Sequence, residues 1–127
     1  MDKPKILIVD DKLANIISLE TLLSEKNIDF IRAQSGQEAL RTTLDNDFAL
    51  ILMDIQMPEM DGEEATKIIR EKWPVKEQPW IVAMTAHALG GDREHYMTGG
   101  MDDYISKPLN VKELMRILER SPRKAIL

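Results

Sequence analysis

Five short apolar runs alternate with stretches of helical periodicity, and this alternation sets the fold class of the chain. The clearest run covers residues 49–53 and stops at Asp54, before a turn that contains Pro58 and Gly62. A run this short, bounded by turn residues, is typical of a strand buried on both faces. Strands that alternate with helices form right-handed crossovers. The sequence therefore predicts an α/β fold, with a parallel sheet covered by helices on both faces.

Capping residues and changes of period predict the individual elements. Ser35 and Asp61 each precede a glutamate by three residues, the pattern of a helix N-terminus, and Asn110 is expected to cap the last helix. The expected core face of that helix consists of Val111, Leu114, Met115 and Leu118. Strands are expected at residues 6–9, 28–33, 49–54, 80–84 and 103–106, and helices at about 13–26, 35–44, 61–72, 89–98 and 110–120. We expect one domain over residues 1–127, with a core at about 5–118 and a tail at 121–127.

Composition narrows the possible functions. Hydrophobic residues make up 43% of the chain and charged residues 31%, as in globular proteins. The net charge of −5, with both signs interspersed, does not provide the basic face that binds nucleic acid. The chain has no cysteine, which excludes disulfides and thiolate metal sites. No apolar run approaches the ~20 residues of a membrane span, and no signal peptide begins the sequence, so a cytoplasmic protein without membrane contact is expected.

Four of the five expected strands end in a charged or reactive side chain. These are Asp10 and Asp11, Asp54, Thr85 and Lys107. Because the carboxyl ends of parallel strands meet at one edge of a sheet, we expect these side chains to converge. Two like charges ~4 Å apart cost ~4 kcal/mol at an effective dielectric near 20, so three carboxylates require a cation or a proton. Lys107 supplies one positive charge, and oxygen ligands favour Mg²⁺, or Mn²⁺ in substitution, for the rest.

This set of residues suits phosphoryl transfer. Asp54 can act as a nucleophile and form an aspartyl phosphate, while the metal, Lys107 and the Thr85 hydroxyl hold the phosphoryl oxygens. Each residue taken alone has an ordinary structural alternative, as a helix cap, a turn residue or a solvated surface residue. Their joint occurrence at successive strand ends favours the functional interpretation. The residues expected to lie outside this site are the caps and turn residues Asp61, Asp102 and Asp103 and the surface residues His87 and His95.

The chain resembles the receiver domain of two-component response regulators, from about residue 5 to 118. The matching segments are residues 8–11, 53–62, 83–86 and 104–108. The resemblance implies a flavodoxin-like, doubly wound sheet of five parallel strands in the order 2-1-3-4-5, with five helices. Within the family, residues 84–88, 91–94 and 100–104 are similar to receivers of hybrid histidine kinases.

The resemblance also implies a role for each site residue. Asp54 would be the phospho-acceptor, and Asp10, Asp11 and Asp54 would surround Mg²⁺ together with the backbone carbonyl of Gln56. Thr85 and Lys107 would contact the phosphoryl group. Thr85 and Tyr104 would form the switch, in which the Tyr104 ring moves inward when Thr85 turns toward the phosphate. The bond between Lys107 and Pro108 would be cis.

The expected function is that of a phosphoryl-accepting signalling switch. A histidine kinase or a histidine phosphotransfer domain would donate the phosphoryl group to Asp54 in a Mg²⁺-dependent reaction. Phosphorylation would shift an output face made of residues 89–98, the fifth strand and the last helix. The chain would catalyse only its own phosphorylation and dephosphorylation, and would therefore not be an enzyme in the usual sense.

Three alternatives belong to other functional classes. An aspartate-nucleophile phosphatase of similar fold needs a second aspartate two residues after the nucleophile, where this chain has Gln56. A flavin carrier needs a phosphate loop after Val9, where Asp10 and Asp11 stand instead. A partner-binding module without phosphorylation would not need the complete set of site residues. We expect a monomer or a phosphorylation-dependent dimer, with Ile117 as a candidate contact, and either a free-standing regulator or a part of a longer protein.

Overall fold

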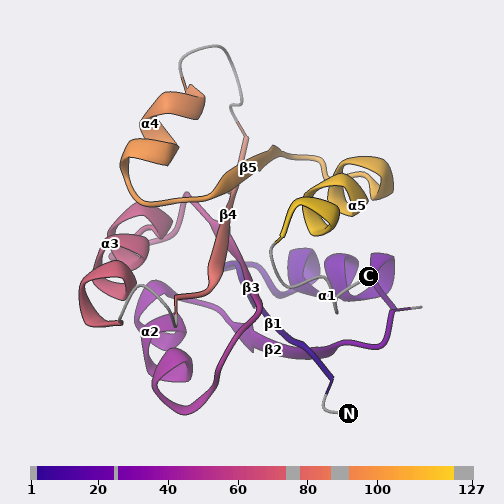
Figure 1. Ribbon diagram of the computed structural model, residues 1–127, viewed down its shortest axis with the longest axis horizontal. Coiled ribbons are helices and arrows are strands. Elements are labelled where there is room, and N and C mark those ends of the chain that lie inside the picture. Colours follow the sequence, from indigo (N-terminus) through magenta and orange to yellow (C-terminus); the bar gives the residue numbers. More distant parts are fainter. Residues whose placement is uncertain (1–2, 25, 74–77, 87–91, 122–127) are drawn as a thin grey trace.

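The computed structural model describes residues 3–24, 26–73, 78–86 and 92–121. Within these ranges the chain forms one five-stranded parallel sheet in the order β2-β1-β3-β4-β5, with five helices (Figure 1). The strands are β1 (Lys5–Val9), β2 (Asp29–Ala33), β3 (Leu50–Asp54), β4 (Trp80–Thr85) and β5 (Asp103–Ser106). The helices are α1 (Leu13–Leu22), α2 (Gly36–Asp45), α3 (Gly62–Lys72), α4 (Asp92–Thr98) and α5 (Val111–Arg120). The strand order and the doubly wound architecture expected from the sequence are confirmed.

The two faces of the sheet are covered by different helices (Figure 1). Alternate residues of β1 point to opposite faces, so Ile6 and Ile8 join one core cluster while Leu7 and Val9 join the other. The first cluster includes apolar residues of α1 and α5, and the second includes residues of α2, α3 and α4. All five residues of β3 are buried, as the unbroken apolar run predicts for a central strand. The more polar β2 lies at an edge of the sheet.

The parallel register brings the carboxyl ends of the strands to one edge of the sheet. Val9 pairs with Met53, so the residue after β1 stands beside the last residue of β3. On the other side of β3, Asp54 pairs with Met84, and Thr85 in turn pairs with Ser106. This pairing lines up the segments that carry the expected site residues.

Helix α1 is shorter than the sequence predicts. It ends at Leu22 and not near residue 26, because Leu23 turns out of the helix and the next residues form tight turns. Its inward face is narrow: Ile16 and Leu19 are buried, whereas Leu13 and Ile17 are 42% and 45% exposed. The apolar spacing of this segment therefore contains two residues that face away from the core.

The predicted core face of α5 is partly wrong. Asn110 caps the helix as predicted, and Leu114 and Leu118 are buried. Val111, however, is 46% exposed, and Ile117 is only 1% exposed. The buried face of the helix includes Ile117 and continues to Ser121. The helix is therefore rotated about its axis relative to the orientation that the apolar spacing suggests. Since Ile117 belongs to the core, it cannot be the dimer contact that the sequence suggested.

Helix α4 and the region before it are described only in part. The helix covers Asp92–Thr98, and the expected helical residues 89–91 lie outside the described residues, as does His87. His95 is exposed, as expected for a surface residue, and its Nε2 contacts the carboxylate of Glu63 on α3.

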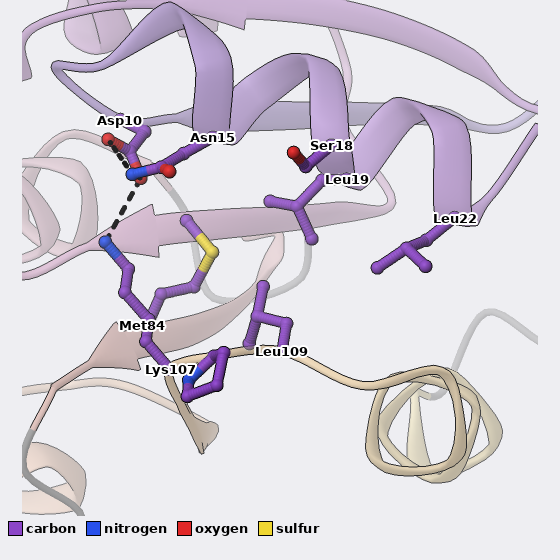
Figure 2. A pocket seen from close by; sticks show the side chains of 9 residues that line it. Asp10, Asn15, Ser18, Leu19, Leu22, Met84, Lys107 and Leu109 are labelled. Carbon is purple, nitrogen blue, oxygen red and sulfur yellow. Dashed lines mark hydrogen bonds and ion pairs between the residues drawn. The ribbon is translucent and has the colours of Figure 1, made fainter.

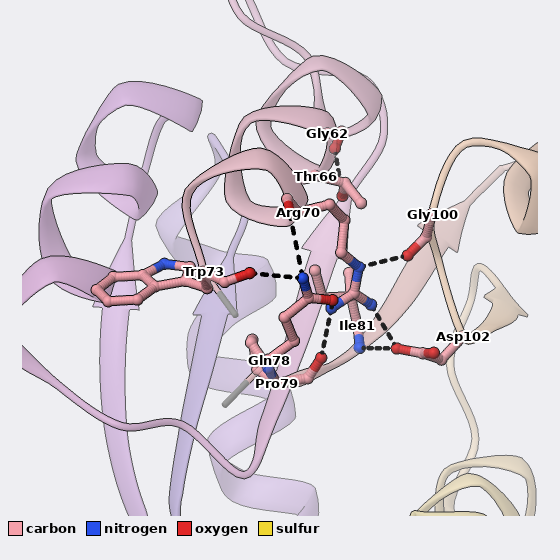
Figure 3. A network of polar contacts seen from close by, with 9 residues as sticks. All are labelled: Gly62, Thr66, Arg70, Trp73, Gln78, Pro79, Ile81, Gly100 and Asp102. Carbon is pink, nitrogen blue, oxygen red and sulfur yellow. Dashed lines mark hydrogen bonds and ion pairs between the residues drawn. The ribbon is translucent and has the colours of Figure 1, made fainter. Parts of the chain in front are cut away.

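Arg70, near the end of α3, joins this helix to the segments that precede β4 and β5 (Figure 3). Its guanidinium donates to the carbonyls of Gly100 and Pro79 at 2.7 and 2.9 Å and to Asp102 Oδ2 at 2.6 Å. Asp102 also accepts from the backbone N–H of Ile81. Asp102 lies in the bend before β5, as the sequence predicts, and its carboxylate is in addition an ion-pair partner of Arg70.

The other two aspartates of that prediction differ in outcome. Asp61 caps α3 as expected, because its Oδ1 accepts from the Glu64 N–H at 2.8 Å. Asp103 is the first residue of β5, is buried, and accepts from Arg120 Nη1 at 3.2 Å.

Among the described residues, no helix combines the length and the apolar character needed to cross a membrane.

Candidate functional site

Asp10 is fully buried at the end of β1, and local contacts fix both of its oxygens. Oδ1 accepts from the backbone N–H of Lys12 at 2.9 Å, and the Asn15 amide lies 3.2 Å from each carboxylate oxygen. Figure 2 shows Asp10 between the Asn15 amide and the ammonium of Lys107. The first turn of α1 thus holds the carboxylate in a defined orientation. The sequence did not single out Asn15, because a polar residue in the first helical turn has no distinctive pattern.

Asp54 is the last residue of β3 and is 4% exposed. The start of α3 lies directly against it, since a Cβ atom on Gly62 would stand 2.2 Å from the Asp54 carbonyl oxygen. Only glycine permits this approach without a shift of the backbone. The Gly62 N–H also donates to the Ile55 carbonyl at 3.1 Å. The turn after β3 therefore packs closely against the backbone of Asp54.

Lys107 follows β5 and bridges two of the carboxylates. Its Nζ lies 3.0 Å from Asp54 Oδ1 and 3.2 Å from Asp10 Oδ2. Its backbone N–H donates to the Thr85 carbonyl at 2.8 Å, and the Lys107–Pro108 peptide bond is cis. One ammonium therefore faces two buried carboxylates.

The protonation equilibria of this group follow from burial and charge. Burial raises the pKa of the Asp54 carboxyl, and the nearby Asp10 charge adds to the increase, against the hydrogen bond from Lys107. For Lys107, burial acts to lower the pKa, but the hydrogen bonds and charges of Asp54 and Asp10 outweigh burial and raise it. Lys107 thus remains charged, while the ionised form of Asp54 is disfavoured when no further cation is bound.

The geometry of three carboxylates fits a hard divalent cation. Asp10, Asp11 and Asp54 each offer one oxygen, and these oxygens lie within 4.8 Å of one another. Carboxylate oxygens in this number suit Mg²⁺, which binds one or two carboxylates and retains waters. The backbone N–H of Gln56 hydrogen-bonds Asp54, and the Gln56 side chain is exposed. The loop after β3 therefore stays next to the cluster.

The two expected switch residues lie on the α4 side of the site. Thr85 is 4% exposed, and its Oγ1 lies 3.0 Å from the hydroxyl oxygen of Tyr96 on α4. Tyr104 on β5 is half-buried, and its ring centroid lies 6.4 Å from that of Tyr96. Sequence reasoning missed Tyr96, because an aromatic residue in a short helix is most simply explained as core packing.

A groove extends from the carboxylates along α1 (Figure 2). Its volume is about 520 Å³, and Asp10 and Lys107 line one end of it. Apolar side chains line much of the remainder, from α1, β4 and the segment after β5. They are Leu19, Leu22, Met84, Pro108 and Leu109.

The family model of the response regulator receiver domain matches residues 6–119, which is nearly the whole chain. The chain is a response regulator receiver domain. Receivers are phosphoryl-accepting switches of two-component signalling, and this is the function of the chain.

Relatives of this receiver include parts of sensor kinases. It is 37% identical over 117 residues to the sensor protein GacS of Pseudomonas syringae pv. syringae. The match covers 91% of this chain but 13% of GacS. The chain thus spans about an eighth of the length of that relative. The resemblance to receivers of hybrid histidine kinases is confirmed, since curated hybrid kinases of Dictyostelium discoideum match as well.

Two solved structures are especially informative for this receiver. The receiver domain of sensor histidine kinase PA1611 from Pseudomonas aeruginosa, with magnesium coordinated in the active site cleft, is 36% identical with a TM-score of 0.82. That match covers 94% of this chain and 98% of the other. A co-crystal structure of the Saccharomyces cerevisiae phosphotransfer protein Ypd1 and the Ssk1 receiver gives 32% identity and a TM-score of 0.85. It covers 98% of this chain and 93% of the matched chain.

Proposed function

We propose that Asp54 is the phosphoryl-accepting residue of this receiver and that Asp10, Asp11, Asp54 and the Gln56 carbonyl hold Mg²⁺. The observation that carries the proposal is that the carboxylates of Asp10, Asp11 and Asp54 lie close together. Lys107 contacts two of them, Asp10 and Asp54. A single ammonium does not balance this negative charge, whereas a divalent cation does.

The residues have distinct tasks in the proposed transfer. An oxygen of Asp54 attacks the phosphorus of a phosphohistidine, so an O–P bond forms while the P–N bond breaks and the imidazole leaves with its electron pair. Bound Mg²⁺ supplies charge neutralisation for the phosphoryl oxygens. Lys107 turns from the unmodified carboxylate toward a phosphoryl oxygen, and the Thr85 hydroxyl donates a hydrogen bond to another. The switch then consists of Thr85 and Tyr104.

The same geometry disfavours a phosphatase that acts on external substrates. The position two residues after Asp54 holds Gln56, whose exposed amide does not ionise and therefore cannot act as a general acid or base toward a leaving group. We therefore propose that the chain turns over only its own aspartyl phosphate and is not an enzyme with a separate substrate.

The partner that we propose is a histidine kinase or a histidine phosphotransfer domain. The groove beside Asp10 and Lys107 gives it a docking surface continuous with the reactive carboxylate, and exposed Leu13 and Ile17 lie on the same helix α1. The complex of Ypd1 with the Ssk1 receiver supports this class of partner. The output face that we propose consists of α4, β5 and α5, in a monomer or a phosphorylation-dependent dimer. Residues 5–118 form the core of one domain, which can also stand within a longer protein.

Intact-mass measurement after treatment with a small acyl phosphate tests the proposal. With Mg²⁺, the wild-type chain is expected to gain the mass of one phosphoryl group, and without Mg²⁺ the gain should be lost. Asp54→Asn should show no gain under either condition, whereas the exposed Asp45→Asn should behave like wild type. Equal labelling of Asp54→Asn and wild type would refute the assignment.

A further inference from the structure

We propose that Tyr96 is a positioning residue for the phosphorylation switch, because its hydroxyl holds the hydroxyl of Thr85 toward α4 in the unphosphorylated receiver. The inference rests on the proposed function, in which Thr85 must donate to a phosphoryl oxygen on Asp54. Tyr96 then sets part of the free-energy cost of activation. It lies on a different element from Tyr104, the switch aromatic expected from the sequence.

The contact itself is short and buried. The two hydroxyl oxygens lie 3.0 Å apart, and Thr85 and Tyr96 are 4% and 7% exposed. Either hydroxyl can donate in this pair. A hydrogen bond between buried groups is costly to leave unmade, because water cannot replace the lost partner. Movement of the Thr85 hydroxyl away from Tyr96 therefore has a free-energy cost.

The register of the sheet shows that this contact points away from the phosphorylation site. Asp54 pairs with Met84, and paired residues of neighbouring strands point to the same face. Thr85 follows Met84 and so points to the opposite face, where Ala83 and Tyr96 belong to the same core cluster. Met84 lines the groove together with Asp10 and Lys107. To reach a phosphoryl oxygen, the Thr85 hydroxyl must leave the side on which Tyr96 holds it.

The contacts of α4 extend the effect beyond Thr85. The Tyr96 ring packs edge-on against His95, with centroids 5.5 Å apart, and His95 contacts Glu63 on α3. On its other side the Tyr96 ring lies 6.4 Å from that of Tyr104. Release of Thr85 therefore changes the constraints on Tyr96, which sits between α3 and β5. In this way Tyr96 connects the phosphorylated carboxylate to the position of α4.

Tyr96→Phe tests the proposal, because it removes the hydroxyl and keeps the ring. Beryllofluoride, which stands in for the phosphoryl group on Asp54, is expected to bind the variant roughly 2- to 10-fold more tightly at saturating Mg²⁺, the factor for one net hydrogen bond. Mg²⁺ affinity should not change, because the oxygens that face the cation come from Asp10, Asp11 and Asp54 and not from Tyr96. A merely structural loss would not tighten beryllofluoride binding at constant Mg²⁺ affinity. Thr21→Val, which removes an exposed hydroxyl bonded only within α1, is the matched control.

A double-mutant cycle assigns the effect to Thr85. In the Thr85→Val background, Tyr96→Phe should leave beryllofluoride affinity unchanged. Unchanged or weaker binding by Tyr96→Phe alone, or equal tightening in the Thr85→Val background, would overturn the proposal. Tyr96→Leu also lacks the hydroxyl but removes the ring contacts with His95 and Tyr104 as well, so it separates the effect of the ring from that of the hydroxyl. If wild type binds no beryllofluoride and Asp54 accepts no phosphoryl group, the proposed function fails and not the role of Tyr96 alone.

Discussion

The ammonium of Lys107 lies 3.0 Å from Oδ1 of Asp54, although Lys107 follows β5 and Asp54 ends β3, two strands that are not neighbours in the sheet. β4 separates β3 from β5, so the lysine side chain reaches across the end of β4. It also meets Asp10 at the end of β1. One flexible side chain thus spans the row of strand ends from β5 to β1. A mobile point charge of this kind can contact a free carboxylate and, after transfer, a phosphoryl oxygen.

We expect Asp54→Asn to stabilise the metal-free protein at neutral pH. The raised pKa of Asp54 means that the folded state binds this proton more tightly than the unfolded state does. The free energy of unfolding should therefore fall as pH rises from the ordinary carboxyl range through the raised pKa. Asparagine removes that loss and the repulsion with Asp10, so the variant should be more stable than wild type above this window.

Urea unfolding in EDTA at pH values below and above this window checks the prediction. The free energy of unfolding of Asp54→Asn should exceed that of wild type at neutral pH and approach the wild-type value at acid pH. Asp45→Asn, at an exposed position at the end of α2, serves as the control. An asparagine variant that is less stable than wild type at neutral pH would show that the Lys107 pairing outweighs the burial and repulsion of Asp54.

Mg²⁺ should stabilise the folded chain by an amount that rises with the logarithm of its concentration above the dissociation constant. A ligand that binds only the folded state at 100 times its dissociation constant adds about 2.7 kcal/mol to the free energy of unfolding. Asp11→Asn should shift this stabilisation to higher Mg²⁺ concentration, because it removes one of the three oxygens of the cluster. Thermal melts across a Mg²⁺ titration at constant ionic strength measure the effect. Equal Mg²⁺ dependence in wild type and Asp11→Asn would exclude Asp11 from the metal site.

The apolar runs and their alternation with helices predicted the parallel sheet and the convergence of Asp10, Asp54 and Lys107, whereas the strand order came only from the resemblance to receiver domains. The sequence did not predict the contacts that hold these groups. Asn15 and Tyr96 act through side-chain hydrogen bonds between elements, and no periodicity marks such pairs. The turn to α3 looked like an ordinary cap, whereas Gly62 is required by the backbone of Asp54.

The helix faces show a second limit of sequence patterns. The spacing of apolar residues in α5 suggested Val111 as part of the core face and left Ile117 out, but the structure exposes the first and buries the second. Either orientation of the helix about its axis places apolar residues that are three or four positions apart on the buried face. Only the packing of α5 against β5 and α1 distinguishes them, and that packing is a tertiary property.

Ile17→Glu should separate transfer from a protein donor from transfer from a small molecule. Ile17 is 45% exposed on α1 and lies four residues after Leu13, which is 42% exposed, so the two form one apolar patch. A charge there opposes docking of an apolar partner surface but does not touch the carboxylates. We expect slower transfer from a phosphorylated histidine phosphotransfer domain, by roughly tenfold for a loss of ~1.4 kcal/mol in docking.

Labelling by a small acyl phosphate is the matched measurement for Ile17→Glu, and its rate should stay at the wild-type value. Val111→Glu is the control variant, because Val111 is equally exposed, at 46%, but lies on α5. If both donors slow equally with Ile17→Glu, the substitution disturbs the site itself and the patch on α1 is not a docking surface.

Arg70→Met should destabilise the fold without abolishing labelling of Asp54. The side chains of Arg70 and Asp102 are only 18% and 27% exposed, and the guanidinium also bonds the Gly100 and Pro79 carbonyls. Removal of one partner leaves the other charge poorly compensated, so we expect a loss of roughly 2–4 kcal/mol in the free energy of unfolding. Urea unfolding measures this loss, and Lys67→Met, at an exposed position of the same helix, is the control.

Asp102→Asn alone should cost less than Arg70→Met, because the amide oxygen can still accept from the Ile81 N–H. A loss no larger than that of Lys67→Met would mean that this network does not hold α3 to the segments that precede β4 and β5.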